Sequence, residues 1–338
     1  MKFIGFVQKG KNPKETSVKI HLLKQRLNKF GRMIITTSQV VSFAWKLKGD
    51  LYHFHDPELL PWAVLLSWRN KKIIYDVHES VPADILNKQY LNPAFRKFLS
   101  LAVGFLEMFA SKRMSAIVCA TSYISYRFLA KSKNVIVINN YPRVEELSAT
   151  TVLNTPKENA VLYVGDITYA RGILQIMDAV ALMPDVRLEL AGNFSDKNIE
   201  AEIRNHAAWP QTNYHGFIDQ KKYSQLLSTC KIGFVLFLPE PNHINAQPNK
   251  LFEYMSAGLP VIASHFPLWK EIIETPNTGI CVDPLNKIAV MDAMKTVLSD
   301  ENLASTMSSN GVKAIRNHYN WKNEEQKLLK LYENLLSN

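Results

Sequence analysis

Lys250 and Glu253 lie three positions apart in a short segment that the sequence predicts to be a helix between two strands. Pro248 suits a first helical position because it has no N–H to leave unpaired, and Gly258 ends the helix, which we expect over about 248–257. Residues three apart project from one side of a helix, whose N-terminus attracts phosphate. The lysine can therefore meet a diphosphate while the glutamate accepts hydrogen bonds from a ribose diol. A solvated ion pair on an amphipathic helix is the alternative.

A second group of candidates follows a predicted strand, where Gly165 forms a turn and Arg171 lies close to the start of a helix. A cation beside the positive end of a helix dipole is unfavourable unless an anion lies between them, which favours a phosphate role for Arg171. Gly192 and Gly216 end two further strands, where the lack of a Cβ would let a ligand approach the backbone. Turn geometry explains these glycines equally well.

Polar residues also follow two predicted strands of the first half, at the sheet edge where ligands of open α/β sheets bind. His55 and Asp56 follow one of these strands, with Asp56 placed to cap the helix that comes next. His78 and Glu79 follow the other, which puts an imidazole beside a carboxylate. Capping alone explains Asp56, whereas a structural role and a functional role stay equally open for His78.

The length and composition of the chain predict its architecture. With 338 residues it exceeds the usual size of one hydrophobic core, which favours two domains. Apolar content of 47% and charged content of 21% are typical of a globular protein that is neither disordered nor membrane-spanning. Strands alternate with helices in both halves, so the predicted fold class is α/β with parallel sheets. The expected strands lie near 2–7, 33–37, 51–55, 72–77, 116–120 and 135–138, and near 160–165, 186–192, 213–216, 232–238, 260–264 and 279–282.

Charge is distributed unevenly along the chain. The formal net charge is +10, but residues 1–150 hold 23 lysine and arginine residues against 10 aspartate and glutamate residues, a net charge of +13. The basic half is expected to face an acidic partner, which nucleic acid, anionic phospholipid or a lipid-linked pyrophosphate acceptor would provide. The sequence has no recognisable motif for specific binding of nucleic acid.

The cysteines and the first residues bear on the compartment. Cys119, Cys230 and Cys281 are too widely spaced for a disulfide framework or a metal knuckle, which favours a reducing cytoplasm. The apolar run over 1–7 stops at Gln8 and is too short for a signal peptide, so we expect a first strand there. The expected localisation is therefore cytoplasmic.

The segment from Asn92 to Arg113 combines aromatic residues with basic flanks. A membrane-spanning helix needs about 20 apolar residues, and Gly104 and Glu107 interrupt a shorter run, so we expect that this segment does not span a membrane. An interfacial helix and a helix packed beneath the first sheet would have similar sequences. The positive charge of the first half favours peripheral contact with an anionic inner leaflet.

Taken together, several segments resemble a known family. The donor half of the family-four retaining glycosyltransferases is similar to Gly165, Arg171-Gly172, Ala191-Gly192, His215-Gly216-Phe217 and above all 248–264. Acceptor-half motifs of one bacterial branch are similar to 53–59 and 75–79. The resemblance implies the GT-B architecture, in which two Rossmann-like domains face each other across a cleft. The implied parts are an acceptor-binding domain over 1–145, a linker over 146–158, a nucleotide-sugar-binding domain over 159–318 and a helix over 319–338 that returns to the first domain.

The resemblance also implies an activity and roles for individual residues. The activity is transfer of a sugar from a nucleotide-diphosphate sugar to a glycan or lipid-linked acceptor with retention of configuration, without a metal or other cofactor. Glu253 resembles the carboxylate that binds the ribose, Arg171 and Lys250 the cations on the departing diphosphate, and His78 the histidine that contacts the transferring sugar. The other implied donor-binding residues are Gly165, Gly192, Phe217, Ile218, Asn245, Asn249 and Leu251. The implied acceptor-side residues are His55, Asp56 and Glu79.

Three positions depart from the family pattern. Asn245 stands where the family often has the first glutamate of an E-x7-E pair, and Asp166 stands where an arginine is usual. The residues Gln8–Lys14 replace the usual glycine-rich loop. A catalytically weak or silent partner subunit is therefore an alternative, and a nucleotide-sugar 2-epimerase of the same architecture is another.

Overall fold

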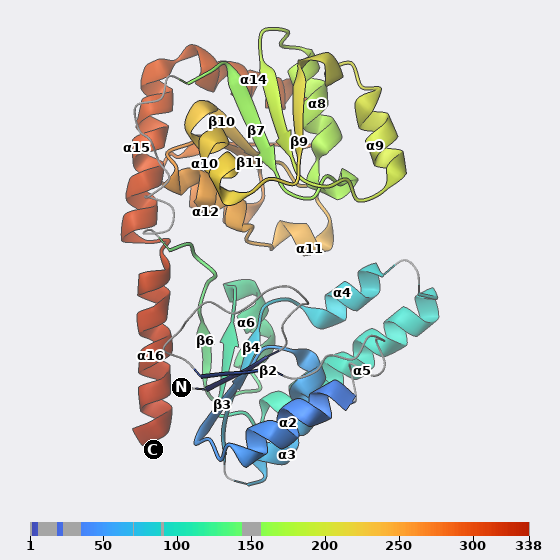
Figure 1. Ribbon diagram of the computed structural model, residues 1–338, viewed down its shortest axis with the longest axis vertical. Helices are drawn as coiled ribbons and strands as arrows, with labels where there is room; N and C mark the ends of the chain where they lie inside the picture. Colours follow the sequence, from blue (N-terminus) through green and yellow to red (C-terminus); the bar gives the residue numbers. More distant parts are fainter. Residues whose placement is uncertain are drawn as a thin grey trace. The chain divides into compact units, whose positions relative to one another are not determined.

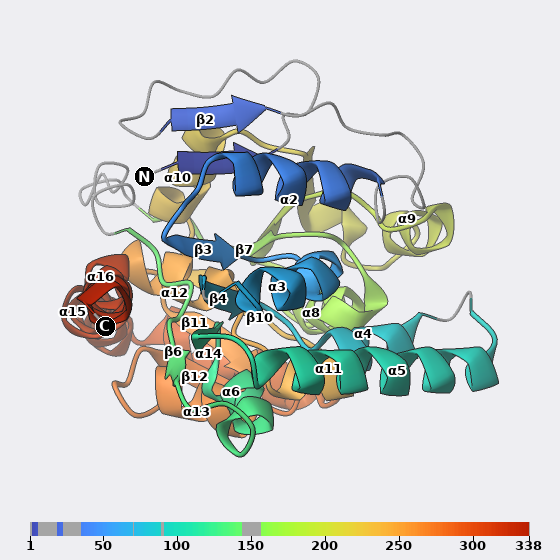
Figure 2. The same cartoon turned by 90° about the horizontal axis from the view of Figure 1, so that it is seen from below.

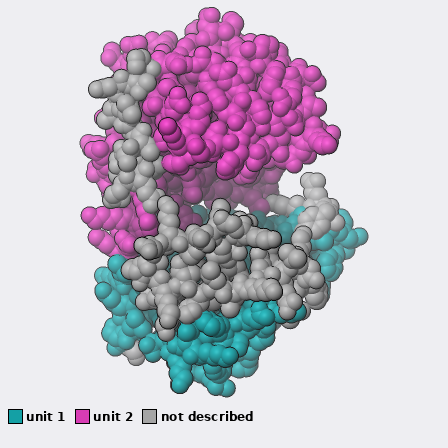
Figure 3. Space-filling view, in the orientation of Figure 1, with its two compact units in different colours: residues 1–139, 327–338 teal, residues 140–326 magenta. Residues whose placement is uncertain are grey.

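A computed structural model describes residues 2–5, 19–22, 35–69, 71–88, 91–143 and 157–337 (Figure 1). The chain divides into two compact units, which Figure 3 colours separately. Unit 1 comprises residues 1–139 and 327–338, and unit 2 comprises residues 140–326. Residues 140–143, which we expected in the N-terminal domain, group with unit 2. Most of the linker expected over 146–158 lies outside the described residues.

Unit 2 contains a parallel sheet of six strands in the order β12-β11-β10-β7-β8-β9. Neighbouring strands that are distant in sequence, such as β7 and β10, require crossover connections, which helices supply. All six strands agree with those expected from the sequence of the second half. They are β7 (Ala160–Val164), β8 (Arg187–Ala191), β9 (Thr212–Gly216), β10 (Ile232–Val235), β11 (Val261–Ser264) and β12 (Gly279–Val282).

Helices cover both faces of this sheet because both faces of its strands are apolar. Val161 and Tyr163 of β7 belong to one buried cluster with residues of α8 and α14. Ala160 and Leu162 belong to a second cluster with residues of α10 and α12, since successive strand residues point to opposite faces. The helices are α8 (Ile173–Ala181), α9 (Lys197–Arg204), α10 (Gln220–Thr229), α11 (Pro241–Ile244), α12 (Asn249–Ser256), α13 (Pro267–Ile273), α14 (Lys287–Ser299) and α15 (Glu301–Asn317).

The ends of α12 follow from its local sequence. Gly258 has a φ of +63°, and the N–H of Leu259 donates to the carbonyl of Tyr254 at 2.9 Å, which is a Schellman ending. Pro248 is the N-cap residue, with extended backbone at φ −64° and ψ 131°, rather than the first helical residue. The helix expected over 248–257 is therefore correct in place and one residue too long at each end.

Unit 1 contains a parallel sheet of four strands in the order β3-β4-β5-β6 and a separate parallel pair, β1 with β2. β2 was not expected from the sequence. The strand expected near 33–37 is wrong in its described part, because residues 35–36 are π-helical and α2 (Thr37–Lys46) follows. A short β-branched run fits a buried helix as well as a strand, and length alone does not separate them. The strands are β1 (Lys2–Gly5), β2 (Lys19–Leu22), β3 (Leu51–Phe54), β4 (Lys72–Val77), β5 (Ala116–Cys119) and β6 (Val135–Val137).

The helices of unit 1 include the long α5, which lies beside α4 (Figures 1 and 2). The side chain of Asn92 accepts from the N–H of Ala94, and Pro93 occupies the first turn, so α5 begins at a strong N-terminal signal. Among the described residues, no helix has both the length and the apolarity that crossing a membrane requires. Besides α2, the helices are α3 (Leu60–Ser67), α4 (Val81–Asn87), α5 (Pro93–Ser111), α6 (Ser122–Leu129) and the part of α16 (Trp321–Ser337) that begins at Lys327.

Candidate functional site

The first candidate site in unit 2 is the α12 cluster, which consists of Tyr223, Lys250 and Glu253. Lys250 Nζ lies 2.5 Å from Glu253 Oε2, and the Tyr223 hydroxyl donates to the same oxygen at 2.6 Å. The ammonium also lies 4.3 Å from the centre of the Tyr223 ring. Burial and the nearby Glu253 carboxylate hold the pKa of Tyr223 well above its ordinary value, so its hydroxyl stays a donor. The spacing that the sequence shows therefore brings a cation and a carboxylate into direct contact.

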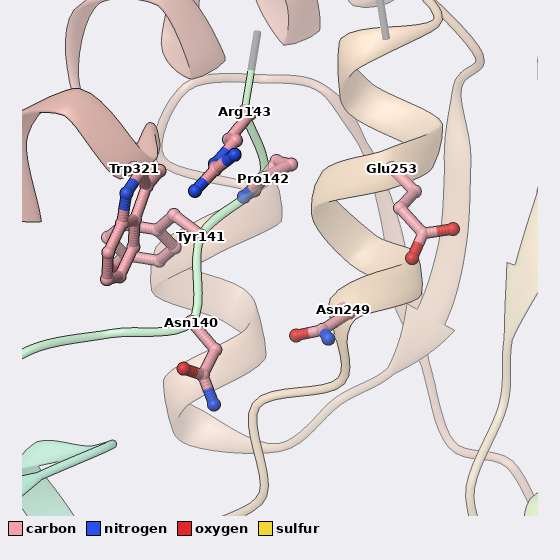
Figure 4. A pocket seen from close by; sticks show the side chains of 7 residues that line it. All are labelled: Asn140, Tyr141, Pro142, Arg143, Asn249, Glu253 and Trp321. Atoms are coloured by element: carbon pink, nitrogen blue, oxygen red, sulfur yellow. The ribbon is translucent and has the colours of Figure 1, made fainter. Parts of the chain in front are cut away.

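A pocket of about 330 Å³ lies beside this cluster within unit 2. Figure 4 shows the segment Asn140–Arg143 running beside α12, with the amide of Asn249 directed toward it. The indole Nε1 of Trp321 is buried and has no hydrogen-bond partner among the described residues. The pocket is thus edged by amides, a cation, a carboxylate and aromatic rings. Its lining residues are Asn140, Tyr141, Pro142, Arg143, Asn249, Glu253 and Trp321.

Arg171 ends a 3-10 turn just before α8, and its Nη2 lies 3.2 Å from the carboxylate of Asp166. The anion that the sequence required beside this cation is therefore supplied by the chain itself. Gly165 and Gly192 directly follow β7 and β8, and a Cβ at Gly192 would lie 1.8 Å from the carbonyl oxygen of Gly165. With a φ of +139° at Gly192, only glycine permits this close approach of the two strand ends.

The remaining donor-binding candidates differ in how accessible their side chains are. Phe217 is 84% exposed directly after β9, whereas Ile218 packs against the apolar cluster that contains α12. Asn245 is the residue that ends α11. Leu251 is fully buried, so a contact with a ligand would have to come from its backbone.

The second candidate site lies in unit 1 and is the histidine cluster, which consists of His53, His55, Asp76 and His78. His53 Nε2 lies 3.2 Å and His55 Nδ1 lies 3.1 Å from Asp76 Oδ2. His78 Nε2 lies 3.0 Å from His55 Nδ1 and 3.6 Å from Asp76 Oδ1. The rings of His53 and His55 stack at 5.0 Å, as do those of His55 and His78 at 5.3 Å.

Hydrogen bonds set the charges of this cluster. Burial by itself would raise the pKa of Asp76, but hydrogen bonds from His53 and His55 hold that pKa well below its ordinary value. The hydrogen bond to Asp76 raises the pKa of His55 above its ordinary value, against the effect of burial. Beside the cluster, burial and the Glu79 carboxylate raise the pKa of Asp84 to about 6. Glu79, an acceptor-side candidate, thus belongs to a carboxylate pair.

Asp56 occupies the N-cap position before a 3-10 turn over Pro57–Leu59, as the sequence predicts, but its side chain makes no capping hydrogen bond. The first turn is closed instead by the backbone, since the N–H of Leu59 donates to the carbonyl of Asp56 at 3.0 Å. The capping explanation of this carboxylate is therefore wrong.

Sequence reasoning missed His53, Asp76 and Tyr223 as members of these clusters. A signal for the first two exists, because His53 and His55 are two apart at the end of β3, and Asp76 and His78 are two apart at the end of β4. A spacing of two places both residues of each pair on one face of adjacent strands. Tyr223 lies 30 residues before Glu253 on another helix, and no local pattern points to it.

Comparison with known proteins identifies the family. A family model described as glycosyl transferases group 1 matches residues 145–314, which is half of the chain. The chain belongs to the group 1 glycosyltransferases. The match covers the turn after β7, the glycines after β7 and β8, and all of α12, so the pairs of Arg171 with Asp166 and Lys250 with Glu253 lie within it.

Two relatives of this group 1 glycosyltransferase are similar at low identity. TuaH of Bacillus subtilis, named as a teichuronic acid biosynthesis glycosyltransferase, is 22% identical over 213 residues, or 60% of this chain and 52% of TuaH. A phosphatidyl-myo-inositol mannosyltransferase of Mycobacterium leprae is 22% identical over 303 residues, or 86% of this chain and 75% of the relative. The chain therefore spans about half the length of the first relative and three quarters of the second.

Solved structures of glycosyltransferases share the fold. A sucrose-phosphate synthase of Thermosynechococcus elongatus matches 99% of this chain and 89% of its own, with a TM-score of 0.76 at 20% identity. HepE of Anabaena, solved in complex with UDP, matches 94% of this chain and 86% of its own, with a TM-score of 0.73 at 16% identity. At these identities the likeness shows the fold alone, which is GT-B with two Rossmann-like parallel sheets.

Proposed function

We propose that this group 1 glycosyltransferase moves a sugar from a nucleotide-diphosphate sugar to a hydroxyl of a glycan or lipid-linked acceptor, with retention of configuration. The observation that carries the proposal is the α12 cluster beside a pocket of about 330 Å³. A ribose diol needs a carboxylate that accepts two hydrogen bonds, and a diphosphate needs nearby cations. Glu253 supplies the first, and Lys250 supplies one of the cations.

In the proposed mechanism, the bond between the anomeric carbon and the diphosphate oxygen breaks while Arg171 and Lys250 neutralise the leaving group. Fixed charges aimed at the developing negative charge are the largest single source of rate enhancement in many enzymes. The departing oxygen takes the proton of the acceptor hydroxyl, whose oxygen bonds to the same face of the sugar. His78 contacts the transferring sugar, and no metal ion is needed for the leaving group.

Each cation must exchange its carboxylate for phosphate in this mechanism. Arg171 now faces Asp166 at 3.2 Å, and Lys250 faces Glu253 at 2.5 Å. When a ribose diol engages Glu253, the ammonium of Lys250 is released toward the diphosphate. The pairs therefore hold the two cations in place before the donor binds.

Thermal unfolding with a panel of UDP-, GDP-, ADP- and CMP-sugars tests donor binding. UDP-glucose is the first to try, since HepE has been solved in complex with it. A donor at 100 times its dissociation constant should stabilise the protein by roughly 2.7 kcal/mol. The shift should disappear in Glu253→Ala and persist in Glu271→Ala, which removes an exposed carboxylate from α13.

Product analysis with the identified donor then separates the alternatives. A glycoside that keeps the donor's anomeric configuration supports the proposal. An inverted C2 centre on the sugar, whether still attached to the nucleotide or released from it, would indicate a 2-epimerase. Donor binding with no product in the presence of candidate acceptors would indicate a silent partner subunit.

We further propose that unit 1 contacts an anionic membrane from the cytoplasmic side through α5. The helix turns its phenylalanines outward: Phe98 is 68% and Phe105 is 75% exposed, whereas Ser100, Glu107 and Ala110 are buried. Soluble proteins rarely expose such a patch without a partner. The exposed apolar residues follow helical spacing and are Phe95, Phe98, Leu101, Phe105 and Phe109.

Charge supports an anionic lipid surface as the proposed partner of this face. Lys97, Lys112 and Arg113 are exposed near the ends of α5, and the Arg113 guanidinium lies 4.1 Å from the ring centre of Phe109. Each basic residue near an anionic leaflet contributes on the order of 1 kcal/mol. Basic flanks and an aromatic face are the features of an interfacial helix.

Flotation with liposomes tests this proposal. The protein should float with vesicles that contain phosphatidylglycerol and stay behind with pure phosphatidylcholine. Phe98→Glu with Phe105→Glu should abolish flotation, whereas Leu285→Glu, at a 63% exposed leucine of unit 2, should leave it unchanged. Absence of binding to anionic vesicles by the unmodified protein would remove the proposal.

A further inference from the structure

The histidine cluster gathers three imidazoles around one carboxylate. The imidazole nitrogens of His53 and His55 and a carboxylate oxygen of Asp76 all lie within 4.8 Å of one another. His55 Nδ1 faces both Asp76 Oδ2 at 3.1 Å and His78 Nε2 at 3.0 Å. One ring nitrogen carries at most one proton, so it cannot donate fully to both neighbours. A cation between these atoms would accept one lone pair from each of the three side chains.

The separations fit one class of metal ion. Tetrahedral Zn²⁺ binds imidazole nitrogen at about 2.0–2.1 Å, which places neighbouring ligand atoms about 3.3–3.4 Å apart. The contacts from His53 and His55 to Asp76 are 3.2 and 3.1 Å, so a small outward movement of each side chain would admit the ion. Imidazole with carboxylate is also the ligand set that zinc and similar borderline metals prefer over Mg²⁺ or Ca²⁺.

The candidate ligand side chains differ in their exposure to solvent. The side chains of His53 and Asp76 are only 11% and 12% exposed, whereas those of His55 and His78 are 52% and 42% exposed. Tyr332 contacts His53 Nδ1 through its hydroxyl at 2.7 Å. When Nδ1 donates to this hydroxyl, the lone pair of Nε2 points toward Asp76, which is how outer hydrogen bonds orient metal-binding histidines.

We infer that His53, His55 and Asp76 form a binding site for one borderline divalent metal ion, with Zn²⁺ the best match and His78 placed to complete it. His53 and Asp76 anchor the ion from the sheet, and His55 closes over it from the solvent side. His78 lies 3.6 Å from the Asp76 carboxylate and provides the fourth ligand after a rotation of its exposed side chain.

One consequence rests on the proposed function. A metal ion that engages His78 removes that imidazole from the transferring sugar, so Zn²⁺ should cause a loss of transfer that a chelator reverses. The binding itself does not depend on this role. Failure of the proposed function would therefore leave the metal site intact, and failure of metal binding would leave the donor site intact.

Calorimetric titration of the untagged, chelator-treated protein with Zn²⁺ tests the site. We expect one tight site whose affinity falls at least about 100-fold in His55→Ala and in Asp76→Asn, because loss of an outer-shell partner alone costs 10–100-fold. Tyr332→Phe should weaken binding by about 10-fold. Co²⁺ in place of Zn²⁺ should give the intense visible bands of four-coordinate cobalt, and these should weaken in His78→Ala.

The chain offers a matched control in unit 2, where His206 Nε2 lies 3.2 Å from Asp178. This pair has the same contact distance as His53 with Asp76 but no third ligand among the described residues. His206→Ala should therefore bind Zn²⁺ like the unmodified protein. Because His55 is half exposed, His55→Ala should fold, and a thermal melt verifies this. Equal Zn²⁺ affinity in the unmodified protein and folded His55→Ala would overturn the inference.

Discussion

The two candidate sites differ in how cationic groups and carboxylates are paired. In unit 2, an arginine and a lysine each face one carboxylate, Arg171 with Asp166 and Lys250 with Glu253. In unit 1, three imidazoles surround the single carboxylate of Asp76. The first arrangement provides positively charged side chains that can exchange a local carboxylate for a ligand. The second gathers groups that change charge or ligate a metal ion.

The difference follows from burial. Asp166 is 69% exposed, so water stabilises its carboxylate whether or not Arg171 remains paired with it. Asp76 is buried, and its negative charge is stable there only because several groups donate to it. Arg171 can therefore exchange Asp166 for another anion at little cost, whereas the buried carboxylate of Asp76 depends on the groups that donate to it.

Removal of the Arg171 or Lys250 side chain should have the largest effect, which is a loss of turnover. Arg171→Ala and Lys250→Ala should each slow turnover of the identified donor by about 10²–10³-fold, because each deletes a charge that stabilises the leaving diphosphate. Turnover is measured as release of the nucleoside diphosphate. Lys295→Ala, at an exposed lysine of α14, serves as the matched control and should be unchanged. Full activity in both site variants would refute the proposed mechanism.

Removal of the buried Asp76 carboxylate should have the next largest effect, which is a loss of stability. Asp76→Ala should lower the free energy of unfolding by about 3 kcal/mol, because a buried network loses its only carboxylate. The midpoint of thermal unfolding should fall by roughly 6–12 °C. Asp166→Ala should change it by less than about 1 kcal/mol, since that pair is exposed. Equal losses of stability in the two variants would contradict the proposed role of burial.

Glu189 tests whether burial, rather than location in unit 1, makes a carboxylate important for stability. It is a buried carboxylate of unit 2 that accepts from His215 at 2.5 Å, Arg187 at 2.7 Å and Asn213 at 2.9 Å. Burial would raise its pKa, but these hydrogen bonds hold the pKa below its ordinary value of 4.5. Its stabilising contribution is therefore present above pH 4.5 and is lost as the pH falls below that value.

Glu189→Gln should consequently cost about 1–3 kcal/mol of stability at pH 7 and progressively less below pH 4.5. Urea unfolding at a series of pH values measures the difference. A cost that stays constant with pH would mean that the charge of Glu189 contributes nothing and that glutamine destabilises only because its NH2 group cannot accept these hydrogen bonds.

Asp166→Asn should have the smallest effect and the most specific one. Without the competing carboxylate, Arg171 should meet a diphosphate more readily, and the affinity for the nucleoside diphosphate should rise about 2- to 5-fold, which is less than 1 kcal/mol. Calorimetric titration with UDP is the first measurement. A weaker affinity would show that Asp166 serves to position Arg171 rather than to compete for it.

Much of the fold could be read from the sequence because the signals are local. The strands of unit 2 are short apolar runs bounded by turn residues, and glycine ends α12 where the backbone must turn left-handed. The two wrong element predictions arise because some local sequences fit more than one structure. The residues near 35 fit a helix as well as a strand, and Pro248 fits either the N-cap or the first helical turn.

The candidate site was only partly predictable, for a different reason. The local sequence pattern places Lys250 and Glu253 on α12 and Arg171 just before α8, since spacing within one helix or turn fixes direction. It does not show that Tyr223 reaches Glu253 from α10, or that Asp166 faces Arg171. These contacts join segments whose separation in sequence carries no periodic signal.

The sequence by itself determined the α/β class, the family and the cation–carboxylate spacing of α12, because each depends on residues within a few positions of one another. Tertiary structure alone decided that β3 and β4 pair side by side, which brings His53 and His55 against Asp76. It also decided that α5 turns its aromatic residues outward, a choice between two faces that its composition leaves open. The pairing register of strands and the rotation of a helix are set by packing against the rest of the chain. A short segment of sequence does not determine this packing.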